Sequence, residues 1–173
     1  MNERVRRSAL VITAGDGAAA GVRDDQSGLR VERRLEALGF AVERRIVPDE
    51  QDQIEIALVE GARRHQLVVT TGGTGLTPRD VTPQATLAVI EYEVPGLAEA
   101  MRAAGRASTP MADLSRAVVG VRQGSLIVNL PGSPKGAMES LAAIEAVLDH
   151  AIETLAGPYD HGERRPAQGD QHS

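Results

Sequence analysis

The sequence has no cysteine, and only 2% of its 173 residues are aromatic. The absence of cysteine excludes a disulfide framework, a thiolate metal site and a cysteine nucleophile, and it is compatible with a reducing cytosol. The three aromatic residues, Phe40, Tyr92 and Tyr159, are too few for a surface on which nucleic-acid bases stack. Any chemistry therefore depends on oxygen and nitrogen groups, and the core is expected to be aliphatic.

Lysine and long apolar runs are also scarce. Lys135 is the single lysine, and the formal net charge is -5. An acidic chain without a basic cluster is a poor ligand for nucleic acid. The first apolar run, residues 9–13, is too short for the apolar part of a signal peptide or for a membrane span. We therefore expect a cytoplasmic protein that binds neither nucleic acid nor a membrane.

Short apolar runs alternate with amphipathic segments along the chain. Residues 9–13 and 67–71 read as strands buried on both faces, and a more alternating strand lies between them at residues 40–47. Gln123-Gly124 predicts a two-residue hairpin turn between two further strands. Apolar residues at helical spacing predict helices that begin near residues 27, 50, 82, 97 and 134. Ser27, Asp49 and Thr82 occupy the positions expected for the N-caps of three of these helices.

No repeat or linker divides the chain, so we expect one domain over residues 1–156 and a polar, disordered tail over residues 157–173. The alternation of strands and helices predicts an α/β fold. We expect a three-layer α/β/α sandwich with a mostly parallel sheet and a small hairpin. Ligands of such sheets bind beyond the carboxyl ends of the strands.

A glycine-rich loop follows the apolar run at residues 67–71. Its residues are Thr71, Gly72, Gly73, Thr74 and Gly75. The glycines allow backbone N–H groups to point at an anion and leave no Cβ to block its approach. The loop is not a Walker A motif, because no Gly-Lys-Ser/Thr follows it. It is not the dinucleotide fingerprint either, because Pro78 stands where a third glycine would be. A turn without a ligand is the alternative interpretation.

Two aspartates are expected at the same edge of the sheet as this loop. Asp80, in Pro78-Arg79-Asp80, would attract Mg²⁺ if a phosphate bound beside it, although a solvated turn residue or an ion pair with Arg79 is the alternative. Asp49 ends the second strand, where capping of the next helix is its simplest role. Both roles are compatible, because a cap uses one carboxylate oxygen.

Two further loops are expected at this edge. Asp16, Asp25, Ser27 and Gly28 follow the first strand and could offer a hydroxyl and helix N-terminal N–H groups to a phosphate. A solvated loop and an N-cap are the alternative. Pro131, Gly132 and Ser133 form a rigid turn that either lines a purine pocket or only reverses the chain. The histidines show no metal-ligand spacing, and no nucleophile elbow follows a strand.

The motifs of the chain also occur together in a specific order. They are residues 71–75, Pro78-Arg79-Asp80, Thr82-Pro83, Pro95-Gly96, Leu114-Ser115-Arg116 and Leu130-Pro131-Gly132-Ser133-Pro134. In this order and spacing they resemble the molybdenum-cofactor biosynthesis family of Mog/MoaB type, which includes the gephyrin G domain. The resemblance covers residues 9–155.

The resemblance implies a homotrimer that transfers AMP from ATP to molybdopterin with Mg²⁺ and releases pyrophosphate. A molybdate-inserting enzyme that receives the product is an implied partner. The catalytic and metal-binding aspartates of the family correspond to Asp49 and Asp80. Its nucleotide-binding loops correspond to Thr71, Gly72, Gly73, Thr74, Gly75, Pro131, Gly132 and Ser133, and its pterin-binding residues to Asp16, Asp25, Ser27 and Gly28. This chain has Gly15-Asp16-Gly17 where the family often has Ser-Asp-Ser or Ser-Asp-Arg.

Two other functions fit the same resemblance. One is a carrier that binds molybdopterin without turning over ATP, and the presence of both Asp49 and Asp80 favours the enzyme over it. The other is a related domain that acts on a pyridine nucleotide, which would normally belong to a longer chain. For the enzyme, we expect Asp80 to hold Mg²⁺ on the ATP phosphates and Asp49 to organise the metal or the attacking phosphate.

Overall fold

A computed structural model describes residues 7–158, and these residues form an α/β fold as expected. The elements in chain order are β1 (Ser8–Ala14), α1 (Asp16–Ala19), α2 (Gln26–Ala37), β2 (Ala41–Val47), α3 (Gln51–Arg64), β3 (Leu67–Thr71), α4 (Thr82–Val89), β4 (Tyr92–Glu93), α5 (Pro95–Arg106), the 3-10 helix η1 (Pro110–Leu114), β5 (Val119–Arg122), β6 (Ser125–Leu130) and α6 (Pro134–Ala156). Most of the tail expected at residues 157–173 lies outside the described residues. Within residues 7–158, no helix combines the length and the apolar character needed to cross a membrane.

The six strands form one mixed sheet in the order β2-β1-β3-β6-β5-β4. Neighbouring strands among β2, β1, β3 and β6 are parallel, whereas β5 runs antiparallel to both β6 and β4. The register pairs Thr13 with Thr71, and Thr71 with Leu130. The loops after β1, β3 and β6 therefore leave the sheet at the same edge, side by side.

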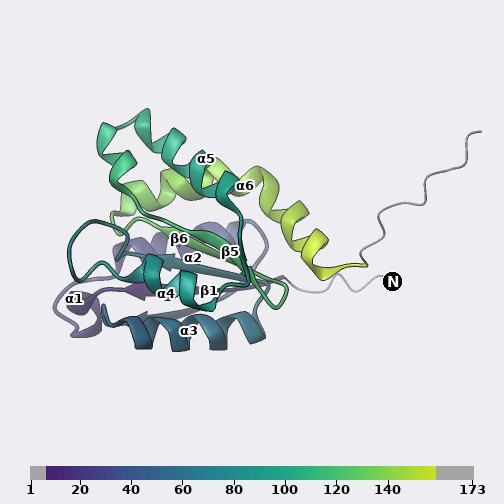
Figure 1. Cartoon of the computed structure of the whole chain (residues 1–173), viewed down its shortest axis with the longest axis horizontal. Helices are drawn as coiled ribbons and strands as arrows, with labels where there is room; N and C mark the ends of the chain where they lie inside the picture. The colour runs from purple at the N-terminus through teal and green to yellow at the C-terminus, as the bar shows by residue number, and fades with distance from the viewer. Residues whose placement is uncertain (1–6, 159–173) are drawn as a thin grey trace, which may run out of the picture.

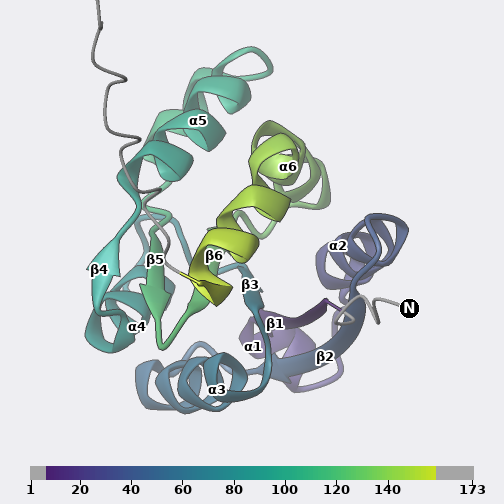
Figure 2. The ribbon, with the colours of Figure 1, turned by 90° about the vertical axis from the view of Figure 1, so that its right-hand side faces the viewer.

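Helices cover both faces of the sheet (Figures 1 and 2), with α2, α5 and α6 on one face and α3 and α4 on the other. Strand β1 supplies both cores, because successive side chains point to opposite faces. Ala9 and Val11 pack with α2 and α6, while Leu10 and Ile12 pack with α3 and α4. This double burial explains the continuous apolar run of β1 and confirms the expected three layers.

The hairpin between β5 and β6 is also confirmed. Gln123 and Gly124 have φ values of 48° and 77°. Positive φ at both central residues is the geometry of the tight hairpin turns that fit the twist of a sheet. Three short elements were not expected from the sequence: α1, β4 and η1. They have four, two and five residues, and all their residues are at least partly exposed, so they carry no apolar pattern.

The expected N-caps are wrong at all three helices. Asp25 caps α2 instead of Ser27, because the Oδ1 atom of Asp25 accepts a hydrogen bond from the N–H of Gly28 at 2.8 Å. Glu50 stands at the N-cap of α3, so Asp49 lies one residue outside that helix. Helix α4 already begins at Thr82, and the hydroxyl of Thr82 donates to the carbonyl of Gly72 rather than capping the helix.

Candidate functional site at the carboxyl edge of the sheet

The glycine-rich loop after β3 is held by its carbonyl groups. Thr82 donates to the first two carbonyls, from its hydroxyl to Gly72 at 3.0 Å and from its N–H to Gly73 at 3.1 Å. Arg116 donates to the next two, from its N–H to Thr74 at 2.9 Å and from Nε to Gly75 at 2.8 Å. All four consecutive carbonyls are therefore directed toward the protein.

The N–H groups of the same peptides are available to a ligand. In a planar trans peptide the N–H points away from the carbonyl, so tying back these carbonyls directs the N–H groups of residues 73–76 the other way. These N–H groups make no hydrogen bond with any described residue. The loop thus has the geometry of an anion-binding cradle, and the binding of a phosphate there stays a prediction.

Asp80 ends the turn that follows this loop. Its Oδ2 atom accepts hydrogen bonds from the N–H and the hydroxyl of Thr77 at 2.9 and 2.8 Å, and its backbone N–H donates to the carbonyl of Thr77 at 3.0 Å. The carbonyl of Asp80 accepts a 2.6 Å hydrogen bond from Nη2 of Arg116. Asp80 is therefore fixed on its backbone and through one carboxylate oxygen.

Asp49 and Asp16 exchange hydrogen bonds across the edge of the sheet. The N–H of Asp16 donates to Oδ2 of Asp49 at 2.9 Å, and the N–H of Asp49 donates to Oδ1 of Asp16 at 3.0 Å. Burial raises the pKa of Asp49, and the charges of Asp16 and Asp80 act in the same direction. The hydrogen bond from Asp16 and the charge of Arg79 oppose this change. Asp49 is thus anchored to the loop after β1, not to the helix that follows it.

Arg79 pairs with Asp16 and not with Asp80, which corrects one of the alternatives drawn from the sequence. Its Nε and Nη2 atoms form a fork on the carboxylate of Asp16 at 3.0 and 2.9 Å, and Nη2 also reaches Glu50 at 2.9 Å. The N–H of Asp49, followed by Arg79, lowers the pKa of Asp16. The carboxylate of Asp16 is therefore already occupied by protein groups, and its expected role in pterin binding stays a prediction.

The start of α2 is built from buried polar groups. Oδ2 of Asp25 accepts a 2.7 Å hydrogen bond from the hydroxyl of Thr13, and the side chain of Asp25 is 4% exposed. The hydroxyl of Ser27 donates to Thr71 at 3.2 Å. Asp25 and Ser27 thereby join β1, α2 and β3. A Cβ on Gly28 would lie 2.2 Å from Asp25, so glycine there serves this packing.

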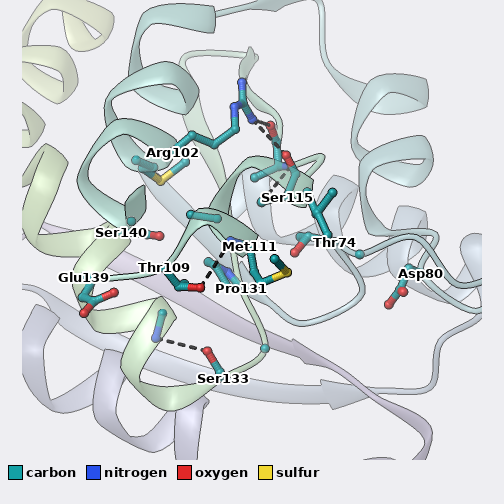
Figure 3. A pocket seen from close by; sticks show the side chains of 18 of the residues that line it. Thr74, Asp80, Arg102, Thr109, Met111, Ser115, Pro131, Ser133, Glu139 and Ser140 are labelled. Atoms are coloured by element: carbon teal, nitrogen blue, oxygen red, sulfur yellow. Dashed lines mark hydrogen bonds between the residues drawn. The ribbon is translucent and has the colours of Figure 1, made fainter. Parts of the chain in front are cut away.

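Two cavities meet at the glycine loop. The first, of about 530 Å³, lies between the loop, α5, η1 and the start of α6, and includes Met101, Met111 and Leu114. Figure 3 shows it with Asp80 at one end and Glu139 and Ser140 at the other. The second, of about 630 Å³, lies between the loop, α1 and the start of α2. The four residues that line both cavities are Gly73, Asp80, Gly132 and Ser133.

Most of the site residues expected from the sequence line these cavities. Those on the second are Asp16, Asp25, Ser27, Asp49, Thr71 and Gly72, together with the four shared residues. Thr74, Gly75 and Pro131 line the first cavity, and Gly28 lines neither. Ser133 also caps α6, since its hydroxyl oxygen accepts a 3.1 Å hydrogen bond from the N–H of Gly136. The contacts of Arg79 and Arg116 were missed, because they join residues far apart in the sequence.

The carboxylates fit a magnesium ion bound together with phosphates. Oδ1 of Asp49 and Oδ1 of Asp80 accept no hydrogen bond from residues 7–158, and both aspartates line the second cavity. Residues 7–158 contain no group of three or more histidine, aspartate or glutamate side chains that could hold a metal ion by themselves. Mg²⁺ commonly uses one or two carboxylates and completes its shell with water and substrate phosphates. This donor set meets that requirement.

Comparison with known proteins identifies the family. Residues 10–150 match the family described as "Probable molybdopterin binding domain". The chain belongs to this family. Among curated proteins, the molybdopterin adenylyltransferase of Helicobacter pylori strain J99 is 42% identical over 156 residues, which cover 86% of this chain and 88% of that protein. The molybdopterin adenylyltransferase of Escherichia coli K12 is 39% identical over 166 residues, and the match covers 86% of this chain and 85% of that protein.

Solved structures of the molybdopterin-binding family have the same fold. The molybdopterin biosynthesis enzyme MoaB from Thermus thermophilus is 48% identical, with a TM-score of 0.81, over 87% of this chain and 97% of that one. The Mog protein of Mycobacterium ulcerans is 41% identical, with a TM-score of 0.82, over 86% of this chain and 99% of that one. The resemblance to Mog and MoaB proteins found in the sequence is thereby confirmed.

Proposed function

We propose that this molybdopterin-binding protein is a molybdopterin adenylyltransferase of molybdenum cofactor biosynthesis. In the proposed reaction, Mg²⁺-dependent transfer moves AMP from ATP to molybdopterin and releases pyrophosphate. The observation that carries the proposal is the meeting of Asp80 and the glycine loop at the junction of two cavities, with Asp49 lining the second. The names of relatives at about 40% identity over most of both chains support it.

The chemistry requires two anions to come together. The second pKa of a phosphomonoester is about 6, so the terminal phosphate of molybdopterin is largely dianionic at neutral pH and needs no general base. One of its oxygens attacks the α-phosphorus of ATP, and the bond from that phosphorus to the oxygen bridging to the β-phosphate breaks. The electron pair leaves with pyrophosphate. Catalysis then depends on positioning and on neutralising charge.

The residues of the site divide these tasks. The N–H groups of residues 73–76 bind phosphate oxygens in the direction that Thr82 and Arg116 impose. Asp49 and Asp80 would hold Mg²⁺, which supplies positive charge to the phosphates when bound. The two cavities provide separate places for the nucleotide and the pterin, with Asp80 and Gly73 at their junction.

A pyrophosphate-release assay with molybdopterin, ATP and Mg²⁺ tests the proposal. We expect Asp49→Asn and Asp80→Asn each to lower kcat by at least about 100-fold, because each removes a negative charge that would hold Mg²⁺ on the phosphates. Asp52→Asn is the matched control, since Asp52 is an exposed acid in the first turn of α3 that lines neither cavity. Near-normal rates in both Asp49 and Asp80 variants would show that the metal assignment is wrong. Tight binding of molybdopterin without pyrophosphate release would instead favour a carrier.

We also propose a cytoplasmic homotrimer that passes adenylylated molybdopterin to a molybdate-inserting enzyme. The family resemblance supports the trimer, and the absence of cysteine is compatible with a reducing compartment. Sedimentation equilibrium is the direct measurement. A particle of three times the 18.3 kDa of one chain is the expected result, and a monomer at all concentrations would contradict it.

A further inference from the structure

Arg116 stands out because it binds the loop that forms the proposed site without lining either cavity. It lies in the segment between η1 and β5, and its side chain is partly buried. Nε donates to the carbonyl of Gly75 at 2.8 Å, and Nη2 donates to the carbonyl of Asp80 at 2.6 Å. Nη1 donates to the side chain of Gln84 in α4 at 3.2 Å. One guanidinium therefore joins the glycine loop, the turn at Asp80 and α4.

The acceptors of Arg116 are carbonyl oxygens and an amide, and no carboxylate of residues 7–158 lies within 4.0 Å of it. It thus holds the backbone of Asp80 without neutralising the carboxylate of Asp80. Oδ2 of Asp80 is directed by Thr77, so Oδ1 is left for a ligand. The positive charge of Arg116 is also left without an acidic partner there, which favours an anion nearby.

The position of Arg116 is fixed in turn by α5. Nη1 of Arg102 donates to the carbonyls of Ser115 and Ala117 at 3.3 and 3.2 Å, on either side of Arg116. Figure 3 shows Arg102 reaching to this segment across the wall of the first cavity. The segment that carries Arg116 is therefore held on one side by α5 and holds the glycine loop on the other.

We infer that Arg116 is a positioning residue whose guanidinium directs the N–H group of Leu76 and holds the backbone of Asp80, so that this N–H group and the carboxylate of Asp80 face the phosphates of the nucleotide. This role rests on the proposed function, and it extends that function to a residue that touches no substrate. The peptide geometry carries the inference, because a carbonyl tied to Arg116 fixes the opposite direction of the following N–H. The Leu114-Ser115-Arg116 motif thereby gains a physical role.

The test compares Arg116→Met and Arg116→Lys with the matched variant Arg122→Met. Arg122 also donates to a backbone carbonyl, that of Val89 at 2.6 Å, but it lies in β5 and lines neither cavity. The first measurement is amide hydrogen exchange of the ligand-free protein, which reports local opening. The N–H groups near the loop that are hydrogen-bonded, and so can report its opening, are those of Thr77, Asp80 and Thr82. We expect at least about 10-fold faster exchange of these three groups in Arg116→Met, with unchanged exchange in β1 and β3. Arg122→Met should leave the exchange of Thr77, Asp80 and Thr82 unchanged.

The second measurement is binding of Mg²⁺–ATP and turnover. Misplacing reactive groups by about 1 Å costs about 100-fold in rate, so we expect kcat/KM to fall about 100-fold in Arg116→Met. The Kd of Mg²⁺–ATP should rise about 10-fold, and Arg116→Lys should be intermediate, since its ammonium keeps the charge but reaches fewer carbonyls. Should Arg116→Met fail to fold, Arg116→Lys provides the same comparison.

Unchanged exchange at Thr77, Asp80 and Thr82 together with unchanged Mg²⁺–ATP affinity in the Arg116 variants would overturn the inference. A fall in kcat/KM that is equally large in Arg116→Met and Arg122→Met would also overturn it, because the effect would then be general destabilisation. An unmodified protein that releases no pyrophosphate would contradict the proposed function instead. The exchange data would still decide the role of Arg116, because they need no substrate.

Discussion

At the scale of single residues, the glycines of the loop serve packing as much as ligand access. A Cβ on Gly72 would lie 2.3 Å from the carbonyl oxygen of Ala14, and one on Gly75 would lie 2.9 Å from Oδ2 of Asp80. A Cβ on Gly73 would lie 2.3 Å from the hydroxyl oxygen of Thr82. Each glycine therefore lets the loop approach a different neighbour: β1, Asp80 or α4.

Gly73→Ala tests this packing. Gly73 has a φ of 66°, where a residue with a Cβ costs about 1–2 kcal/mol, and the new methyl group would also displace the hydroxyl of Thr82. We expect the free energy of unfolding, measured with urea, to fall by at least about 1 kcal/mol. The rate of pyrophosphate release should fall by more than this loss of stability accounts for. The rate falls further because Oδ1 of Asp49 lies 3.4 Å from the same Cβ position.

Gly96→Ala is the control for that substitution. Nothing lies within 4 Å of a Cβ at Gly96, which is near the start of α5. Alanine is favoured over glycine in helices by up to about 1 kcal/mol, so stability should stay the same or rise. Equal stability and activity in the Gly73 and Gly96 variants would show that the loop adapts to a side chain.

At the scale of elements, the sequence predicts those segments whose pattern records burial. Strands β1 and β3 contain continuous apolar runs, residues 9–12 and 67–69, because both faces are covered, and this pattern needs no knowledge of distant residues. The choice of an N-cap residue, in contrast, depends on contacts with residues that are distant in the sequence. Asp25 and Ser27 are both acceptable caps of α2, and the hydroxyl of Thr13 in β1 is what favours Asp25.

The end of α3 gives a prediction of pH dependence. His65 is the C-cap residue, its side chain is 10% exposed, and its buried Nδ1 has no partner among residues 7–158. Nε2 lies 3.4 Å from a carboxylate oxygen of Glu43. Burial lowers the pKa of His65, and the charge of Glu43 opposes this change only in part.

The direction of the pH dependence follows from how readily His65 binds a proton in the folded and in the unfolded protein. Because the folded pKa of His65 is lowered, the unfolded chain binds the proton more readily as the pH falls through its ordinary pKa of about 6.5. The stability due to neutral His65 is present above that pH and is lost progressively below it. We expect the free energy of unfolding to decrease from pH 7.5 to about pH 5.5, and His65→Gln to make this dependence weaker. Identical pH profiles for the two proteins would contradict the prediction.

At the scale of the whole molecule, the parallel arrangement of β2, β1, β3 and β6 places the site. Loops that follow parallel strands leave one edge of the sheet, so the glycine loop, Asp49 and the turn at residues 131–133 could be placed together from the sequence. The division of this edge into two cavities could not be predicted. It depends on α5 and η1 packing above the loop, and on contacts such as that of Arg116 with Asp80.

The proposed metal–nucleotide site predicts a ligand-dependent stability of the whole fold. A ligand that binds only the folded state at 100 times its Kd adds about 2.7 kcal/mol, which for a domain of this size raises the midpoint of thermal unfolding by roughly 5–10 °C. We expect this rise with ATP and Mg²⁺, and a much smaller one with ATP and EDTA, because Asp49 and Asp80 would face the phosphates without a cation between them.

Asp80→Asn and Asp52→Asn separate the metal from general effects of charge. Each removes one negative charge, but only Asp80 lines the cavities. Scanning calorimetry should show that Asp52→Asn keeps the difference between Mg²⁺ and EDTA, whereas Asp80→Asn loses most of it. If ATP stabilises the unmodified protein equally with Mg²⁺ and with EDTA, the carboxylates of Asp49 and Asp80 do not bind the nucleotide through a metal. The glycine loop would then be the main phosphate-binding element of the site.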